Sequence, residues 1–352
     1  MSRIAVVLFN LGGPDGPEAV RPFLFNLFND PAIIAVPGPL RGLLARLIAA
    51  RRAPVARRIY DELGGGSPLL AETEAQARAL EAALADAGEV RAFPCMRYWH
   101  PMSDAVAREV AAFAPERVLL LPLYPQFSTT TTASSLTEWR RAAAAAGLAA
   151  PGTGICCYPA AGGLVEAQAA LIRPRLLTAA AAGQGRPRLL FSAHGLPKKV
   201  VARGDPYQWQ VERTSAAVAE RLRRDGIDAL DWQICYQSRV GPLEWIGPST
   251  EAEIRRAGRD RVPVVLTPIA FVSEHSETLV ELDIEYRKLA AEHGVPAYER
   301  VPALGTEPGF IAALADLVRQ ALGRPAGSTA PDGGRRLCPA AFRRCPCPAE
   351  AA

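Results

Sequence analysis

The fold is decided by two similar stretches of sequence, Leu119-Leu-Leu-Pro-Leu-Tyr-Pro-Gln-Phe-Ser128 and Val264-Val-Leu-Thr-Pro-Ile-Ala-Phe-Val-Ser273. Each begins as a continuous apolar run of strand length and leads into a hydroxyl-rich helix start. Strands that are apolar at every position are typical of parallel sheets, because helices cover both faces of such a sheet. The two stretches therefore predict equivalent strands in two similar halves of the chain.

A second pair of similar segments supports the two halves. Residues 6–14 end in Asn-Leu-Gly-Gly-Pro, and residues 189–197 end in Ala-His-Gly-Leu-Pro, where the glycine is expected to permit a sharp turn. Apolar runs alternate with helical patterns along the chain: strands are predicted at residues 4–10, 118–123, 188–193 and 262–268, and helices at residues 136–145, 208–224 and 274–292. This alternation predicts an α/β fold of two similar doubly wound, Rossmann-like domains, each with a parallel sheet flanked by helices. Because ligands of such sheets bind outside the carboxyl ends of the strands, we expect an active-site cleft between the domains.

The length of 352 residues fits two domains. We expect an N-terminal domain over residues 1–158 and a C-terminal domain over residues 159–305. A C-terminal helix over residues 306–325 is expected to pack back on the first domain. Residues 326–352 are rich in Gly, Pro, Ala and Cys, so this tail is not expected to fold by apolar burial alone.

Charge and hydropathy exclude several classes of protein. The net charge of +4 is spread without a long basic run, which argues against nucleic acid as a partner. The N-terminus lacks the pattern of a signal peptide, and no run of about 20 apolar residues predicts a spanning helix. We therefore expect a cytoplasmic protein.

One apolar segment, residues 28–54, is open to two interpretations. Its apolar positions are interrupted by prolines and flanked by arginines, including Arg52. The spacing fits a core helix, and the prolines and arginines fit an interfacial lip at a cleft mouth or in a lipid headgroup layer. The lip interpretation allows peripheral contact with the inner face of a membrane.

The candidate catalytic groups lie at predicted strand exits. His194 follows the strand at residues 188–193, where an imidazole suits proton transfer near neutral pH or metal coordination, although a core histidine fits as well. His275 lies near a helix start, where structural and functional roles are both open. Glu277, Glu281 and Glu285 are spaced to share one helix face, as a solvated face or as a line of oxygen ligands for a divalent cation.

The seven cysteines favour metal ligation over disulfides in a cytoplasmic chain. Three of them, Cys338, Cys345 and Cys347, lie close together in the tail. With a fourth thiol they would complete an iron–sulfur or zinc site, and Cys156 or Cys157 is available for it.

Taken together, these motifs resemble the ferrochelatase family over nearly the whole chain. The longest matches are Leu189-Leu-Phe-Ser-Ala-His-Gly-Leu-Pro197, Gln237-Ser-Arg-Val-Gly-Pro-Leu-Glu-Trp-Ile-Gly-Pro248 and Pro268-Ile-Ala-Phe-Val-Ser-Glu-His-Ser-Glu-Thr-Leu-Val-Glu-Leu-Asp-Ile-Glu-Tyr286. Residues 10–14, 64–68, 96–101, 124–128 and 203–207 also resemble family segments, in family order. The resemblance favours the lip interpretation of residues 28–54.

The resemblance implies an enzyme that inserts Fe2+ into protoporphyrin IX and releases two protons to form protohaem, the last step of haem biosynthesis. It implies catalytic roles for His194, Glu277 and His275, and an Fe2+ route along His194, Glu277, Glu281 and Glu285. The match implies that the residues that bind the porphyrin are Leu11, Tyr60, Ser67, Arg97, Tyr98 and Trp245. Three candidates to hold its anionic propionates stay open, namely Ser67, Arg52 and backbone amides. The tail resembles that of the cluster-bearing bacterial members, which implies a [2Fe-2S] cluster on Cys338, Cys345, Cys347 and Cys157 or Cys156.

Two alternatives to this function stay open. A chelatase of this fold can act on a related tetrapyrrole, such as coproporphyrin III or a sirohydrochlorin. A non-catalytic tetrapyrrole or iron carrier is the alternative outside enzymes. The sequence does not predict an oligomeric state.

Overall fold

The computed structural model describes residues 2–182, 185–239 and 243–347. The last five residues of the expected tail, and residues 240–242 of the motif at 237–248, lie outside the described residues. The chain forms two compact units. The first comprises Met1–Cys157, Leu314–Leu337 and Pro346–Ala352, and the second comprises Tyr158–Ala313 and Cys338–Cys345.

The first unit is built on a five-stranded parallel sheet in the order β2-β1-β3-β4-β9. α11 (Pro308–Leu322) contributes its residues from Leu314 onward. The other elements of this unit are β1 (Arg3–Asn10), η1 (Pro17–Ala19), α1 (Val20–Phe28), α2 (Gly38–Asp61), α3 (Leu69–Ala83), β2 (Glu89–Met96), α4 (Ser103–Phe113), β3 (Arg117–Pro122), α5 (Thr132–Ala145), β4 (Gly152–Ile155) and β9 (Thr329–Ala330).

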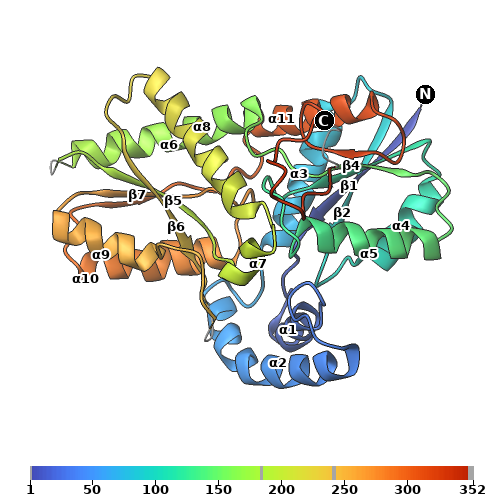
Figure 1. The fold of residues 1–352 in the computed structure, drawn as a ribbon, viewed down its shortest axis with the longest axis horizontal. Helices are drawn as coiled ribbons and strands as arrows, with labels where there is room; N and C mark the ends of the chain where they lie inside the picture. The colour runs from blue at the N-terminus through green and yellow to red at the C-terminus, as the bar shows by residue number, and fades with distance from the viewer. Residues whose placement is uncertain (1, 183–184, 240–242, 348–352) are drawn as a thin grey trace. The chain divides into compact units, whose positions relative to one another are not determined.

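The second unit is built on a four-stranded parallel sheet in the order β6-β5-β7-β8. Figure 1 shows its helices along both faces of the sheet. Its elements are α6 (Gly162–Ala181), β5 (Arg188–His194), α7 (Lys198–Ala202), α8 (Tyr207–Arg224), β6 (Asp231–Gln237), α9 (Thr250–Asp260), β7 (Val264–Pro268), the π-helix η2 (Glu277–Glu285), α10 (Tyr286–Glu292) and β8 (Tyr298–Arg300).

The two sheets share one strand order. β1, β2, β3 and β4 of the first unit occupy the same positions as β5, β6, β7 and β8 of the second. The paired sequence segments therefore lie on equivalent strands, since residues 6–14 and 189–197 leave β1 and β5, while residues 119–128 and 264–273 leave β3 and β7. The predicted fold of two similar doubly wound α/β halves is confirmed. In each half the winding reverses beside the first strand, which is where ligands of such sheets bind.

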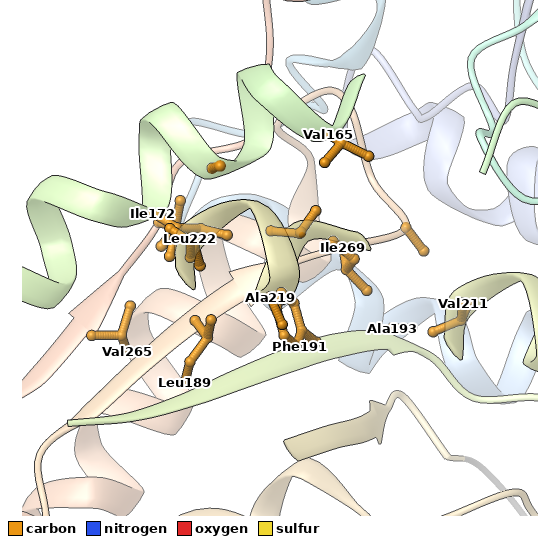
Figure 2. Close-up of a cluster of buried hydrophobic side chains, with 14 of the residues drawn as sticks. Val165, Ile172, Leu189, Phe191, Ala193, Val211, Ala219, Leu222, Val265 and Ile269 are labelled. Atoms are coloured by element: carbon orange, nitrogen blue, oxygen red, sulfur yellow. The ribbon is translucent and has the colours of Figure 1, made fainter. Parts of the chain in front are cut away.

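The core of the second unit explains why β5 is apolar at successive positions. Leu189, Phe191 and Ala193 pack in one buried cluster with residues of α6 and α8, among them Ile172 and Leu222 (Figure 2). The intervening side chain of Leu190 belongs to a second cluster with residues of α9, η2 and α10. Alternate side chains of a strand point to opposite faces, so burial on both faces requires the continuous apolar run seen in the sequence.

The apolar segment at residues 28–54 is largely the helix α2. Its small residues, Ala49 and Ala53, pack in a buried cluster with residues of α1. Two of its larger apolar residues are exposed to solvent instead, Leu43 by 55% and Leu47 by 60%. This exposure fits the lip interpretation and does not fit a plain core helix. No helix within the described ranges is long and apolar enough to cross a membrane.

The helix predicted at residues 274–292 differs from a regular α-helix. Residues Glu277–Glu285 form a π-helix, and the α-helix α10 begins only at Tyr286. A π-helix forms backbone bonds from residue i to i+5, so its turns are wider and residues four apart stay near one face. The spacing of Glu277 and Glu281 is compatible with either helix, which is why the pattern alone predicts only a shared face.

The described part of the tail is ordered by backbone pairing. β9 adds to the edge of the first sheet through the partners Gly154↔Thr329 and Ile155↔Ala330. Just beyond it, the Asp332 amide donates to the Cys157 carbonyl at 3.1 Å. Backbone hydrogen bonds to the sheet therefore order this part of the tail, which is too poor in apolar residues to be ordered by their burial.

Candidate active site

The candidate site lies at the carboxyl ends of strands in the second unit. His194 is the last residue of β5 and lies in register with Gln237, the last residue of β6. Ser238 follows directly, and Glu277 opens the π-helix that comes after β7. Adjacent parallel strands end at one edge of the sheet, so residues far apart in the sequence meet there.

The central interaction joins His194 to Glu277. The Nδ1 atom of His194 lies 2.9 Å from Oε2 of Glu277. Burial acts to lower the pKa of His194, but the charge and hydrogen bond of Glu277 outweigh it and the pKa is raised above its ordinary value. Burial acts in the opposite sense on Glu277, and the His194 charge outweighs it to hold the pKa of that carboxyl below its usual range. The ring therefore has Nε2 left to exchange a proton.

Ser238 connects the two carboxylates of the site. Its hydroxyl lies within hydrogen-bond distance of Glu277 and of Glu281, and its backbone N–H donates to Glu281 Oε1 at 3.0 Å. Tyr286 donates its hydroxyl to the same Glu281 oxygen at 2.8 Å. Burial, followed by the Glu277 charge, raises the pKa of Glu281. One serine hydrogen can donate to only one of the two carboxylates at a time.

Ser238 adopts a backbone conformation that is uncommon for its type. Its φ of 58° lies in the left-handed region, where residues other than glycine are strained. Such conformations persist where surrounding contacts determine them, and they occur most often at functional sites. The contacts of Ser238 with Glu277 and Glu281 hold it in this conformation.

His275 is buried beside this network, with 6% of its surface exposed. Its Nδ1 lies 3.3 Å from the Ser273 carbonyl, and its ring centroid lies 4.4 Å from that of Phe271. Burial lowers the pKa of His275, so the ring is neutral at physiological pH. Its Nε2 is buried without a hydrogen-bond partner among the described residues, a state that suits an additional ligand or water.

Gly195 follows His194 and packs against Trp245. A Cβ atom at Gly195 would lie 3.0 Å from the Gln237 carbonyl oxygen and 3.3 Å from Trp245 Cε3. Gly195 is not among the residues with positive φ, so the close approach of the chain, rather than a left-handed conformation, accounts for a glycine here. The Trp245 Nε1 atom is buried without a hydrogen-bond partner in the described part of the chain.

A second polar cluster lies in the first unit, around Asp30. This carboxylate is 3% exposed and forms an ion pair of 2.8 Å with Arg97. It also accepts hydrogen bonds from the hydroxyls of Tyr98, at 2.8 Å, and of Ser134. Burial, followed by the Asp30 charge, raises the pKa of Tyr98, whose side chain is 1% exposed. Asp30 thus fixes the positions of two predicted porphyrin-binding residues.

The remaining predicted porphyrin-binding residues of the first unit have separate surroundings. Leu11 follows β1 and contacts the cluster that contains buried Tyr60. The Ser67 amide donates to the Pro14 carbonyl at 2.7 Å, so the loop at residues 64–68 packs on the exit of β1. Arg52 stacks over the Phe28 ring, with 5.7 Å between its guanidinium carbon and the ring centroid.

The predicted iron route is only partly assembled. Glu277 and Glu281 share the Ser238 network, whereas Glu285 is exposed and takes no part in it. Over the ranges that the structure covers, no group of three or more His, Cys, Asp and Glu side chains has the arrangement of a metal site.

Several cysteines lie close together, and none of the seven forms a disulfide. All seven lie in the described part of the chain, and each is a thiol. The Cys156 Sγ atom lies 3.4 Å from that of Cys157 and 3.5 Å from that of Cys347. In the second unit, Gln210 donates its side-chain N–H to the Cys338 sulfur at 3.1 Å. In the first unit the Cys156 thiol therefore contacts two other thiols, those of Cys157 and Cys347.

Several residues of the site were not predicted. Gln237 ends β6 and Ser238 follows it, so the sequence signal for them is their place at a strand end beside β5 and inside the family motif at residues 237–248. Asp30 is a single carboxylate in a loop, and only its burial distinguishes it. Tyr286 lies within a predicted helix, so its contact with Glu281 becomes visible only in three dimensions.

Comparisons with known proteins show which family the sequence resembles. The family model described as Ferrochelatase matches residues 3–322. The chain is 58% identical to the ferrochelatase of Caulobacter vibrioides strain NA1000 / CB15N, over 98% of this chain and 97% of the relative. It is 56% identical to the ferrochelatase of Phenylobacterium zucineum, over 98% of each.

The similarity of this chain to solved structures concerns the fold alone. SirB from Bacillus subtilis, solved with Fe3+, aligns with a TM-score of 0.53 at 12% identity, over 92% of this chain and 96% of that chain. The family match covers β1 to β8 and includes the residues of the His194–Glu277 pair. On this evidence the chain belongs to the ferrochelatase family.

Proposed function

We propose that the protein inserts Fe2+ into protoporphyrin IX, releasing two protons and forming protohaem. Its family membership supports an enzyme of haem biosynthesis that places a metal in a porphyrin. The observation that carries the assignment is the 2.9 Å contact between His194 Nδ1 and Glu277, at the strand ends of a chain that matches this family.

The chemistry requires a base. The two pyrrole N–H bonds of the free porphyrin break as Fe2+ binds the four ring nitrogens, and each proton must leave the ring. Neutral His194 accepts one proton at Nε2, while Glu277 at Nδ1 stabilises the resulting imidazolium, and after that proton has passed on, the neutral ring accepts the second. The raised pKa of His194 makes the ring a stronger base, although it leaves a smaller neutral fraction at a given pH.

The second carboxylate, Glu281, provides a route by which the proton can leave the site. Glu281 has a raised pKa and shares the Ser238 hydroxyl with Glu277, so a proton can pass along this network. We assign the same carboxylates to the approach of Fe2+, with Glu285 at the exposed end. Oxygen ligands and one imidazole bind Fe2+ weakly enough to release it to the porphyrin.

The porphyrin is assigned to the family positions Leu11, Tyr60, Ser67, Arg97, Tyr98 and Trp245, with Arg52 as a candidate partner for the propionates. Arg97 supplies a positive charge that Asp30 holds in place, and the buried N–H of Trp245 supplies a donor that lacks a partner among the described residues. His275, with its unpartnered Nε2, is assigned to charge relay beside Glu277.

An anaerobic insertion assay with purified protein, Fe2+ and protoporphyrin IX tests the function. His194→Ala is expected to abolish protohaem formation while porphyrin binding, followed by fluorescence, changes less than about threefold. His293→Ala is the matched control, because that histidine lies exposed just after α10. Turnover of His194→Ala at the parental rate would refute the assigned base.

Substrate choice is settled by the same assay. Coproporphyrin III and sirohydrochlorin, each offered with Fe2+ or Co2+, are expected to react more slowly than protoporphyrin IX with Fe2+. Preference for either of them would reassign the substrate. Tight porphyrin binding with no metal insertion would instead identify a carrier.

We also propose that Cys338, Cys345 and Cys347, with Cys157 or Cys156, hold a [2Fe-2S] cluster. The support is the contact of Cys156 with Cys157 and Cys347 and the amide hydrogen bond to Cys338. Bound there, such a cluster supplies one-electron redox chemistry, and no step of insertion is assigned to it. The Gln210 side chain would tune it by its hydrogen bond to Cys338.

The cluster is tested by anaerobic reconstitution, with visible absorption and iron and sulfide content as readouts. Cys347→Ser is expected to lose the cluster, and Cys95→Ser, a buried thiol of β2, to retain it. Cys156→Ser and Cys157→Ser identify the fourth ligand by which of them loses absorption. Parental cluster content in Cys347→Ser would refute the ligand set.

Finally, we propose that the exposed face of α2 makes peripheral contact with a membrane. Leu43 and Leu47 lie exposed on a helix that also carries several arginines, a combination that suits a headgroup layer.

A further inference from the structure

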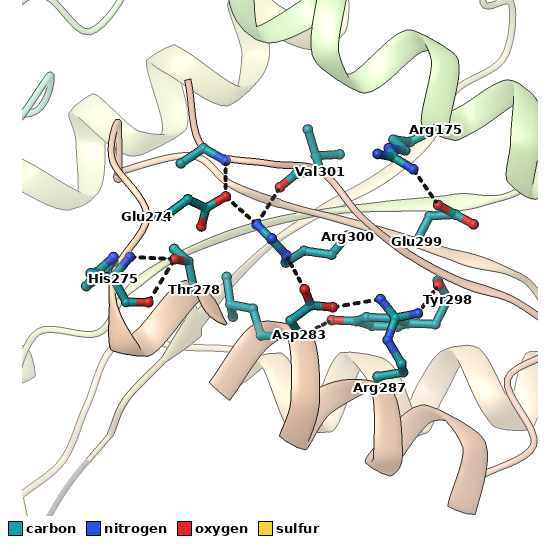
Figure 3. Close-up of polar contacts among 12 residues, drawn as sticks. Arg175, Glu274, His275, Thr278, Asp283, Arg287, Tyr298, Glu299, Arg300 and Val301 are labelled. Carbon is teal, nitrogen blue, oxygen red and sulfur yellow. Dashed lines mark hydrogen bonds and ion pairs between the residues drawn. The ribbon is translucent and has the colours of Figure 1, made fainter. Parts of the chain in front are cut away.

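One arginine holds both ends of the segment that carries the site carboxylates (Figure 3). Arg300, the last residue of β8, donates from Nη1 to Oε1 of Glu274 at 2.8 Å. Its Nε donates to Oδ2 of Asp283 at 3.1 Å. Glu274 comes shortly before Glu277, and Asp283 comes shortly after Glu281. The two contacts therefore bracket the residues that meet His194 and Ser238.

These ion pairs are largely shielded from solvent. The side chains of Arg300, Glu274 and Asp283 are 11%, 18% and 33% exposed. A planar guanidinium directs its N–H groups along fixed directions, so it can reach two carboxylates with defined geometry. A lysine would keep the charge but lose that geometry, which makes the two effects separable by substitution.

Each carboxylate is also fixed by a second donor. The Ala303 amide donates to Glu274 Oε1 at 2.9 Å, and Arg287 Nη2 donates to Asp283 Oδ1 at 2.7 Å. Burial acts to raise the pKa of Asp283, but the Arg287 hydrogen bond and the Arg300 charge outweigh it and the pKa is lowered. Asp283 is therefore ionised near neutral pH and can serve as a permanent anchor.

The bracketed segment needs such anchors because of its conformation. Residues Glu277–Glu285 form a π-helix, which is rare and is retained only where the surroundings determine it. Relaxation of this turn into an α-helix would rotate Glu277 relative to Glu281. Strand β8 supplies a further contact, since the Tyr298 hydroxyl donates to the Leu282 carbonyl at 2.6 Å.

We infer that Arg300 is a positioning residue for metal insertion. It fixes the π-helix in the register that brings Glu277 to His194 and Glu281 to Ser238, and it contacts neither of these carboxylates itself. The inference rests on the proposed function, because its readout is the rate of insertion.

The test compares Arg300→Lys and Arg300→Gln with the parent in the insertion assay. Loss of an outer-shell partner of this kind lowers activity by about 10–100-fold. We expect that loss in kcat, with KM for the porphyrin within about threefold, because Arg300 positions the proton-transfer groups rather than the substrate. The acidic limb of the pH–rate profile should also move to lower pH, because a displaced Glu277 no longer raises the pKa of His194.

Two further variants sharpen the comparison. Arg175→Lys is the matched control, because Arg175 forms an exposed 3.3 Å ion pair with Glu299 of the same strand. It should leave kcat unchanged. Asp283→Asn removes one of the two contacts and should give a smaller loss of kcat, which keeps the inference testable if Arg300→Gln does not fold.

The outcomes separate the inference from the function. Absence of insertion in the parent would overturn the proposed function. Parental insertion together with an unchanged kcat and pH profile in folded Arg300→Lys and Arg300→Gln would overturn the inference alone. A lower midpoint of thermal unfolding, with kcat per folded molecule retained, would also overturn the inference alone.

Discussion

Replacement of Glu277 by glutamine removes the charge beside His194 and keeps a hydrogen-bonding group of the same length. Because the Glu277 charge raises the pKa of His194 while burial lowers it, the variant should titrate at lower pH. His194 remains near Glu281, which also raises its pKa, so the shift reports the loss of one charge of two.

The size of the interaction follows from the 2.9 Å separation between His194 Nδ1 and Glu277 Oε2. Coulomb's law gives about 1.4 kcal/mol at a dielectric constant of about 80 and about 6 kcal/mol at about 20. The His194 side chain is 40% exposed, so solvent screening places the lost interaction energy near the lower limit, and the pKa of His194 should fall accordingly.

The shift is measured by NMR titration of the labelled histidine rings. Only four histidines are present, and the His194→Ala spectrum assigns the signal. Glu292→Gln, at the end of α10, is a control that should not move the signal. The acidic limb of kcat/KM should shift by the same amount. A decrease below about 0.3 units, or an increase, would refute the pairing of His194 with Glu277 in solution.

Three further changes test other parts of the structure. Asp30→Asn leaves Arg97 buried without its counter-charge and should lower the free energy of unfolding in urea by about 3 kcal/mol; a loss below about 1 kcal/mol would contradict the central role of Asp30. Gly195→Ala places a methyl group 3.0 Å from the Gln237 carbonyl and should lower the free energy of unfolding by about 1–3 kcal/mol. It should also slow insertion, because His194 is displaced. Parental stability and rate would show that the site relaxes freely. Leu43→Ser combined with Leu47→Ser should change stability by less than about 0.5 kcal/mol, because both side chains are exposed, yet reduce sedimentation with acidic phospholipid vesicles; equal sedimentation would exclude membrane contact through α2.

The strands that determine the fold were predictable because they are buried on both faces. β1, β3, β5 and β7 occupy inner positions of their sheets, where most side chains are buried and apolar. β4, also an inner strand, and the edge strands β8 and β9 are short, and their pairing depends on neighbours distant in the sequence. The local sequence pattern therefore predicts the long central strands better than the short strands and the edge strands.

The same contrast applies to the site. His194 and Glu277 were predictable because a strand exit and a family motif mark them. Ser238 was not assigned a role, although it follows a strand and lies in the motif at residues 237–248, because a left-handed serine between two carboxylates leaves no periodic signal. Arg300 was not predicted either, since the two carboxylates it contacts lie 26 and 17 residues earlier in the chain.

The pairing of β9 with β4 has a consequence for solubility. An uncovered strand edge presents unsatisfied N–H and C=O groups that recruit strands from other molecules. Because β9 occupies that edge with residues of the cysteine-bearing tail, the tail protects the first sheet from intermolecular association. A chain truncated before Thr329 should therefore aggregate during purification even if every catalytic residue is intact.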